Sequence, residues 1–432
     1  MIKKTLLILF SITFLNQQAF AVTLFEALAE AYRNNPQLNA ERENISVSEE
    51  DLKISKGNYL PSVTISGSKS QEVTNKLTNR AGVEQSVNDV DPTTQSIKIE
   101  QTLMDFGIGA DVQKNKIGIN LANAKLLQKE QEILLKAIEA YSGLIVAIEK
   151  SKINQSNLNL LERQVETDRA RLERGQVTLS DLAQSEASLA GAQANFIQSK
   201  NEIISNKLNY ENVIGPILDI NSLEKIFNND FIIPNDLNNA IMISKKNNPE
   251  LIIAKLEYEQ SEKNMIISRS ELSPTAKLSF ESSRSEDISS TYDERDKEVL
   301  KATLSWPIYS GGKNRASLNK SRNLKNRKKL LLDSVTRNND TNIASSWSTF
   351  QTSKSLLSSV ESQVKAAEIA NEGITVEYES GLGRSTLDVI QSNSILLNAR
   401  IALANAERNY LLAQFEVLKS IGQLNSRYLK LE

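Results

Sequence analysis

The 432-residue chain contains no cysteine and no histidine. Without histidine, a Ser-His-Asp or Cys-His nucleophile and an imidazole metal ligand are excluded. Without cysteine, disulfides, zinc–thiolate sites, iron–sulfur sites and a lipid-bearing N-terminal cysteine are excluded. Charge is nearly balanced, with 51 Lys and Arg against 53 Asp and Glu, which is not the composition of a nucleic-acid-binding protein. We therefore expect no enzyme, no cofactor and no metal site, although carboxylates alone could still support an enzyme.

Proline is also scarce, and its positions matter for helices. The eight prolines occupy positions 36, 61, 92, 216, 234, 249, 274 and 307. None lies within 93–215 or after 307, and proline interrupts helix interiors. A helix over 108–174 would reach about 100 Å at ~1.5 Å per residue. Because globular helices average about 11–12 residues, a compact globule does not accommodate such a helix.

The first 21 residues, MIKKTLLILFSITFLNQQAFA, are a predicted secretory signal peptide. Two lysines form the basic start, an apolar core follows, and Ala19-Phe20-Ala21 is a small-x-small cleavage site. The alternative, a buried first helix, does not explain why the basic start and the cleavage site occur together. The mature chain is expected to begin near Val22. No long uncharged apolar run follows, so the protein is expected to be exported and any membrane span to be a β-barrel.

The chain is internally duplicated. NNPQL at 34–38 recurs as NNPEL at 247–251, an offset of 213 residues, and 175–185 has a counterpart at 381–392. A unit of this length is far longer than a solenoid repeat. The sequence therefore predicts a duplicated domain rather than an array. The predicted repeats are 22–216 and 217–432.

Each repeat is expected to contain one pair of strands and one pair of long helices. The strand segments alternate apolar and polar residues, which suits either a membrane barrel wall or a half-buried soluble sheet. Heptad spacing, as in Leu182, Leu189 and Phe196, favours coiled-coil packing of the helices. The expected strands are 59–70, 94–106, 274–284 and 298–309, and the expected helices are 108–174, 178–214, 311–380 and 384–424.

Four strands are too few to close a barrel, which needs about eight. An open sheet edge in lipid is excluded, because its backbone groups would have no hydrogen-bond partner. A membrane barrel would therefore be shared among protomers. Strand counting alone does not distinguish a dimer from a trimer.

A set of short motifs, in order along the chain, resembles the TolC family of outer-membrane efflux proteins. The motifs are TLFEALAEAYRNNPQL after the signal peptide, GNYLPSVTISGS entering the first strand, QTLMDFG leaving the second, LSWPIYSGGKNRA leaving the fourth, and YESGLGRSTLDVIQSNSILLNAR at 378–400. The resemblance implies a homotrimer in the outer membrane of a Gram-negative bacterium. Its fold would be mainly α with β, a four-strands-per-protomer transmembrane β-barrel joined to a long coiled-coil α-helical barrel in the periplasm.

The resemblance also implies a function. The channel-tunnel would be a passive conduit for type I protein secretion or for small-molecule efflux. The sequence does not distinguish between these two classes of cargo. Its partners would be a periplasmic adaptor protein, an inner-membrane ABC or proton-driven transporter, and outer-membrane lipid, with no nucleic acid. The alternative is an exported coiled-coil adaptor or scaffold without its own pore.

Three residues correspond to the network that closes the periplasmic end in the family. Tyr378 and Arg384 match its tyrosine and arginine, and Asp181 matches the partner carboxylate. An exposed Arg–Asp link would be worth about 1 kcal/mol. Taken without the family, Asp181 follows a glycine-bearing turn at Gly175, where aspartate is usually a helix N-cap.

Two further positions correspond to the pore constriction. Asp388 matches the family's first acidic residue, but Gln391 replaces the second. This replacement halves the number of carboxylates and predicts weaker cation binding. The preceding Gly381 and Gly383 are expected to form a turn or a hinge, although glycines at a helix–helix turn are also ordinary caps.

Overall fold

The computed structural model describes residues 22–85, 89–225, 233–289, 292–381 and 383–431, so the predicted signal peptide lies outside the described residues. The chain divides into two compact units, and each unit takes segments from both predicted repeats. The sheet unit consists of 40–129 and 245–341. The described part of the helical unit lies within 22–39, 130–244 and 342–431.

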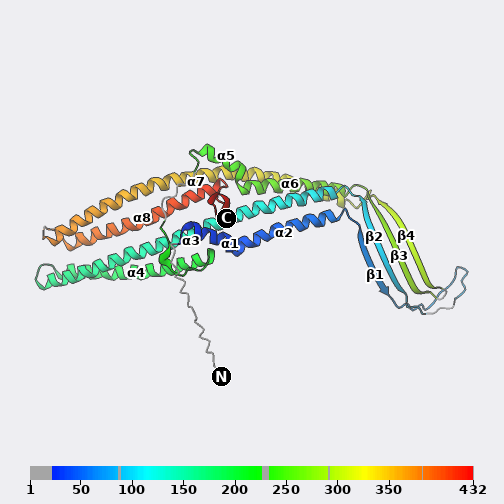
Figure 1. Cartoon of the computed structure of the whole chain (residues 1–432), viewed down its shortest axis with the longest axis horizontal. Coiled ribbons are helices and arrows are strands. Elements are labelled where there is room, and N and C mark those ends of the chain that lie inside the picture. Colours follow the sequence, from blue (N-terminus) through cyan, green and yellow to red (C-terminus); the bar gives the residue numbers. More distant parts are fainter. Residues whose placement is uncertain (1–21, 86–88, 226–232, 290–291, 382, 432) are drawn as a thin grey trace, which may run out of the picture. The chain divides into compact units, whose positions relative to one another are not determined.

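The sheet unit contains a four-stranded antiparallel sheet in the order β1-β2-β3-β4 (Figure 1). Its strands are β1 (Ser62–Lys69), β2 (Thr93–Met104), β3 (Thr275–Ser289) and β4 (Tyr292–Ser305). The register aligns an apolar row across all four strands, formed by Val63, Ile99, Phe280 and Leu300. Val63 is 64% exposed and Leu300 is 70% exposed. The apolar face of the sheet is therefore not covered by the described part of this chain.

The strand bounds differ from the predicted ones, most of all in the β3–β4 hairpin. We expected a polar loop over 285–297, but the ladder continues as far as the pairing of Ser289 with Tyr292. Ion pairs support the extended hairpin: Arg284 contacts Glu286 at 3.0 Å and Glu294 at 3.1 Å. The polar composition of 285–297 led to the wrong prediction of a loop. Backbone pairing in a strand requires no apolar side chains, and charged residues such as Glu286 and Glu294 are exposed here.

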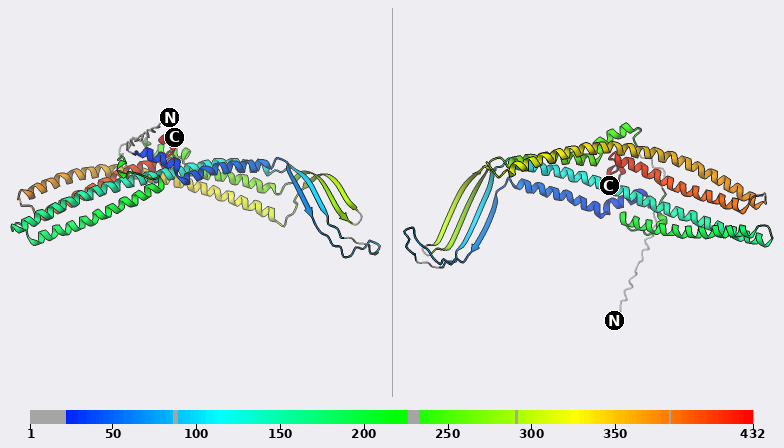
Figure 2. Two further views of the ribbon diagram at one scale, coloured as in Figure 1. Left: turned by 60° about the horizontal axis from the view of Figure 1, so that its bottom comes forward. Right: turned by 180° about the vertical axis from the view of Figure 1, so that it is seen from behind.

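Four long helices follow the predicted pattern. They are α3 (Ile108–Glu173), α4 (Leu179–Val213), α7 (Lys313–Glu379) and α8 (Thr386–Ser420). α4 runs beside α3 and α8 beside α7, so that each pair forms a helical hairpin (Figure 2). Small clusters hold these hairpins together, such as Leu158, Leu161 and Ala192 in the first. Among the described residues, no helix is long and apolar enough to cross a membrane.

Four shorter helices precede the strands, and the sequence analysis did not assign them. They are α1 (Leu24–Asn34), α2 (Pro36–Gly57), α5 (Leu237–Asn247) and α6 (Pro249–Ser270). Local signals were present: Thr23 and Glu26 form a capping box, and Asn248 caps α6 with Pro249 in its first turn. A 3₁₀ turn (Ile220–Ser222) and α9 (Ser426–Leu429) are shorter still.

The main hydrophobic core lies in the helical unit, where α1 and the middle of α3 meet the ends of α4 and α8. Tyr141 of α3, 1% exposed, is its most informative residue. Its hydroxyl lies 2.8 Å from the carbonyl oxygens of both Val22 and Glu224. The backbone N–H of Val22 donates to the carbonyl of Ser222 at 2.8 Å. The predicted start of the mature chain is therefore tied to the connector between the repeats. Fully buried members of this core include Leu24, Leu28, Leu134, Ile138, Leu144, Phe415, Leu418 and Leu424.

Candidate functional site at the hairpin tips

Both helical hairpins turn on a glycine and restart with the same cap. Gly175 and Gly381 have φ of +71° and +74°, which side-chain-bearing residues rarely adopt. Gly383 also has a positive φ, at +83°. After these turns, Thr178 with Asp181 and Ser385 with Asp388 each form a capping box.

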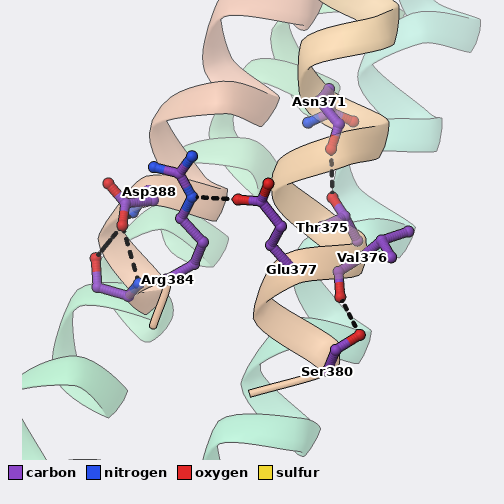
Figure 3. Close-up of polar contacts among 8 residues, drawn as sticks. Asn371, Thr375, Val376, Glu377, Ser380, Arg384 and Asp388 are labelled. Atoms are coloured by element: carbon purple, nitrogen blue, oxygen red, sulfur yellow. Dashed lines mark hydrogen bonds and ion pairs between the residues drawn. The ribbon is translucent and has the colours of Figure 1, made fainter. Parts of the chain in front are cut away.

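The two aspartates are engaged locally. Asp181 accepts from the backbone N–H and the hydroxyl of Thr178, both at 2.8 Å. Asp388 accepts from the same groups of Ser385, both at 2.9 Å (Figure 3). In each case the backbone hydrogen bond, followed by that from the hydroxyl, lowers the pKa of the carboxyl below its usual value.

Arg384 pairs within its own hairpin. Its Nε donates to Oε2 of Glu377 at 2.6 Å, and both side chains are 44% exposed (Figure 3). This hydrogen bond is the main reason that the pKa of Arg384 is raised. Arg384 and Asp181 line one cavity of about 460 Å³ at the tips, but no ion pair joins them in the described protomer. A pairing across protomers stays a prediction.

Tyr378 connects the two hairpins through a residue that the sequence analysis missed. Its hydroxyl donates to Oδ1 of Asp168 on α3 at 2.7 Å. Asp168 is fully buried and also accepts from the Ser185 hydroxyl of α4 at 2.5 Å and from Gln164 at 3.0 Å. The Tyr378 oxygen lies 3.1 Å from the Thr386 hydroxyl at the start of α8. One carboxylate therefore joins α3, α4 and α7, and α8 through Tyr378.

Burial is the main cause of a raised pKa at Tyr378, and its hydrogen bond to Asp168 acts in the same direction. The Arg171 guanidinium lies 4.2 Å above the centre of the Tyr378 ring. Tyr378 therefore remains a neutral donor to Asp168 at physiological pH, and a cation covers its ring.

Gln391 is exposed on α8, one turn after the half-buried Asp388. The residues next to Gln391 face the other way: Ser392 and Asn393 contact Asn371 of α7, the latter at 2.6 Å. Gln391 thus lies away from the seam between α7 and α8, whereas Asp388 is half-buried beside it. The assignment of both residues to a pore constriction stays a prediction.

Asp168 and Glu377 had weak signals in the sequence. Asp168 lies 17 residues before Ser185, on the other side of the α3–α4 turn. Whether two residues at this separation face each other depends on where the turn lies. Glu377 precedes Arg384 by seven residues across the α7–α8 turn. Both pairings became predictable only once the turns were fixed at Gly175 and Gly381.

A second polar cluster lies in the helical unit. Lys225 contacts Glu149 at 2.7 Å and Glu407 at 2.9 Å. Burial is the main cause of a raised pKa at Glu407, repulsion from Glu149 and Glu361 adds to it, and Lys225 opposes it. The net shift means that the ionised carboxylate is less favourable in the folded protein than in the unfolded chain.

Glu407→Gln is therefore expected to raise the unfolding temperature at neutral pH. A raised carboxyl pKa stabilises the fold below the ordinary value of 4.5, and that contribution is lost as pH rises through the folded value. The gain of the variant over the parent should shrink as pH falls through this range, measured by thermal unfolding in detergent. Glu368→Gln, which removes an exposed carboxylate paired with Arg400, is the control and should show no such trend. A pH-independent difference for Glu407→Gln would contradict the assignment.

Comparison with known proteins bears on both halves of the chain. Residues 27–215 and 241–423 each match the family model described as "Outer membrane efflux protein". The chain belongs to this family. It is an outer-membrane protein, and its fold is mainly helical with a small antiparallel sheet built from two tandem repeats.

Curated relatives cover nearly the whole chain. The outer membrane efflux protein BepC of Brucella suis is 25% identical over 422 residues, 96% of this chain and 89% of BepC. The alkaline protease secretion protein AprF of Pseudomonas aeruginosa is 22% identical, over 96% of this chain and 88% of AprF. Among solved structures, the Campylobacter jejuni CmeC outer membrane channel has a TM-score of 0.82 at 16% identity, over 93% of this chain and 85% of CmeC. These similarities fit the channel interpretation rather than an adaptor or scaffold.

Proposed function

We propose that the chain is one protomer of a homotrimeric channel-tunnel through which cargo passes passively from the periplasm to the outside. The observation that carries this proposal is the match of both repeats to the outer membrane efflux family. The exposed apolar row across the sheet supports a lipid-facing barrel wall. The outer strands β1 and β4 have no partner on their free edges in the described protomer, as a barrel shared between copies requires.

The channel would be engaged by a periplasmic adaptor and an inner-membrane transporter. The names of the relatives span two cargo classes, since AprF is a protease secretion protein and BepC an efflux protein. We expect selection of cargo to belong to the transporter. The purified protein should run as a trimer in detergent. Inserted into planar lipid bilayers, it should give discrete conductance steps. A monomer without conductance would contradict the proposal.

The tips of the two hairpins form the gate of this proposed channel. Asp168 and Tyr378 join the hairpins, and Arg384 with Glu377 stiffens the α7–α8 turn. These contacts involve few residues and an exposed ion pair worth about 1 kcal/mol or less, so partner binding could offset them. Gly175, Gly381 and Gly383 supply the backbone freedom for movement at the tips, and Asp181 is available for a contact with a neighbouring copy.

The constriction offers a direct test through Gln391. Replacing Gln391 with aspartate would place a second carboxylate one turn from Asp388 and so double the number in the trimer. If each added carboxylate contributes about 0.5 kcal/mol, the divalent-cation concentration that half-blocks the conductance should fall roughly tenfold. Gln391→Asn is the control. An unchanged blocking concentration would show that Asp388 and Gln391 do not face the pore.

A further inference from the structure

The start of α7 has an unusual concentration of positive charge. Residues 313–329 contain eight Lys and Arg and no Asp or Glu. Two of them pair with α6: Lys328 contacts Glu257 at 2.6 Å and Lys325 contacts Glu262 at 3.5 Å. The other six have no acidic partner within the described part of the sheet unit; they are Lys313, Arg315, Lys320, Arg322, Arg327 and Lys329. Like charges on one helix repel, so this surface favours an acidic partner.

The topology of the sheet unit shows where that partner must lie. α2 leads into β1, α3 follows β2, α6 leads into β3 and α7 follows β4, so the helices keep the order of the strands. Contacts agree with this order: the side-chain amide of Gln260 on α6 donates to the backbone carbonyl of Lys114 on α3 at 3.3 Å, and the hydroxyls of Ser268 on α6 and Ser321 on α7 lie 2.7 Å apart. α2 and α7 are therefore the outermost helices, as β1 and β4 are the outermost strands.

The free face of α2 has the complementary character. Val47 and Ile54, seven residues apart, are 57% and 70% exposed. Glu43 and Glu50, also seven residues apart, flank them on the same face of the helix. Glu50 pairs only with Lys53 of its own helix, through side chains 64% and 69% exposed, a contact that is weak and easily exchanged.

On α7 the side away from α6 carries its own apolar residue among the cations. Leu330 is 69% exposed and continues the seven-residue spacing of Ala316 and Asn323. Lys320 and Arg327 flank this row. α2 thus presents an apolar row beside acidic residues, and α7 presents a row of apolar or small residues beside basic residues.

We propose that the basic face of α7 binds the acidic face of α2 from a second copy of this chain. This inference rests on the proposed homotrimer and specifies which surfaces join its protomers. A β4 strand paired with β1 of the next copy brings these two helices side by side. They run in opposite directions, because α2 ends and α7 begins next to the strands.

The sequence spacing then defines a register. If the ends of the two helices next to the strands are level, Gly57 lies opposite Lys313. In that register Val47 lies opposite Asn323, Glu50 opposite Lys320, and Glu43 opposite Arg327. The two acidic residues of α2, seven residues apart, therefore each face a basic residue of α7, and these two basic residues are also seven residues apart.

Cysteine cross-linking tests the contact, because the native chain has no cysteine to give a background. The full-length double variant Val47→Cys/Asn323→Cys, oxidised in outer membranes, is expected to give covalent multimers on a denaturing gel. Ser48→Cys/Asn323→Cys is the matched control, because Ser48 is the next residue on α2 and is half-buried, whereas Val47 is 57% exposed. The control should cross-link about tenfold less. Arg327→Cys in place of Asn323→Cys covers a register shifted by one turn.

Charge reversal tests the electrostatic part. Added to the cross-linking pair Val47→Cys/Asn323→Cys, Glu43→Arg and Glu50→Arg should reduce the cross-link yield about fivefold, and further reversal of Lys320→Glu and Arg327→Glu should restore it. High salt should reduce the difference in cross-link yield between the variants with native and with reversed acidic residues, because salt screens charge interactions.

If the Cys-free parent runs as a trimer but neither double-cysteine variant cross-links, in either register, this inference is overturned and the proposed channel stays intact. A parent that does not form trimers would overturn both. Retained cross-linking after reversal of the acidic residues alone would overturn the electrostatic pairing. Loss of binding to anionic lipid vesicles in Lys320→Glu/Arg327→Glu, with native-level cross-linking, would assign the basic face to lipid and overturn it too.

Discussion

Single-channel conductance is expected to rise severalfold when Asp168 is replaced by asparagine. The Asp168 carboxylate accepts hydrogen bonds from the side chains of Tyr378, Ser185 and Gln164. Asparagine keeps the shape but turns one acceptor into a donor that faces donors. The loss of charge-assisted hydrogen bonds, about 1.5–3 kcal/mol each, should release the tips of the two hairpins from one another.

The control for this prediction is Glu186→Gln. The Glu186 side chain is 49% exposed and pairs only with Arg169 among the described residues, at 2.9 Å, so its loss should cost about 1 kcal/mol or less and leave conductance nearly unchanged. Tyr378→Phe should reproduce part of the Asp168→Asn effect, because it removes one donor without changing the size of the ring. Normal conductance in Asp168→Asn, with the trimer intact, would show that this carboxylate is not part of the gate.

The largest loss of stability is expected for Tyr141→Ala. The ring is 1% exposed and belongs to the main core, so truncation should cost about 3–5 kcal/mol. Truncation would also leave the carbonyls of Val22 and Glu224 without their shared donor. Thermal unfolding of the purified protein in detergent would show this as a large fall in the transition temperature.

Tyr141→Phe separates the two contributions. It preserves the packing and removes only the hydroxyl, so we expect a loss of about 1–3 kcal/mol. Proteolysis should then cut the connector near residues 219–224 faster than in the parent, because its tie to Val22 is weakened. Equal effects of the two substitutions would mean that the ring itself contributes little.

The architecture could be predicted from the sequence largely because proline and periodicity act over long segments. Two proline-free tracts and heptad spacing predict four long helices, each with ends no more than four residues from the observed ones. The length of the β3–β4 hairpin was underestimated, because charged residues such as Arg284 can belong to a strand when their side chains are exposed.

The site was less accessible to sequence reasoning. Asp181 and Asp388 follow from local capping signals, and the structure shows both in capping boxes. Asp168 is one of many charged residues on a 66-residue helix, and only the packing of α3 against α7 reveals that it is buried. Long-range partners depend on how hairpins dock, which no local pattern encodes.

The link between Asp168 and Tyr378 also bears on symmetry. The two repeats are equivalent in fold, yet the second has Ile374 where the first has Asp168, and the first has Leu172 where the second has Tyr378. In a ring of three protomers, six similar hairpins would alternate between neighbours joined by a buried Asp168–Tyr378 link and neighbours without one, here called untied. Such a ring would open with threefold rather than sixfold character, with the untied boundaries between copies parting first.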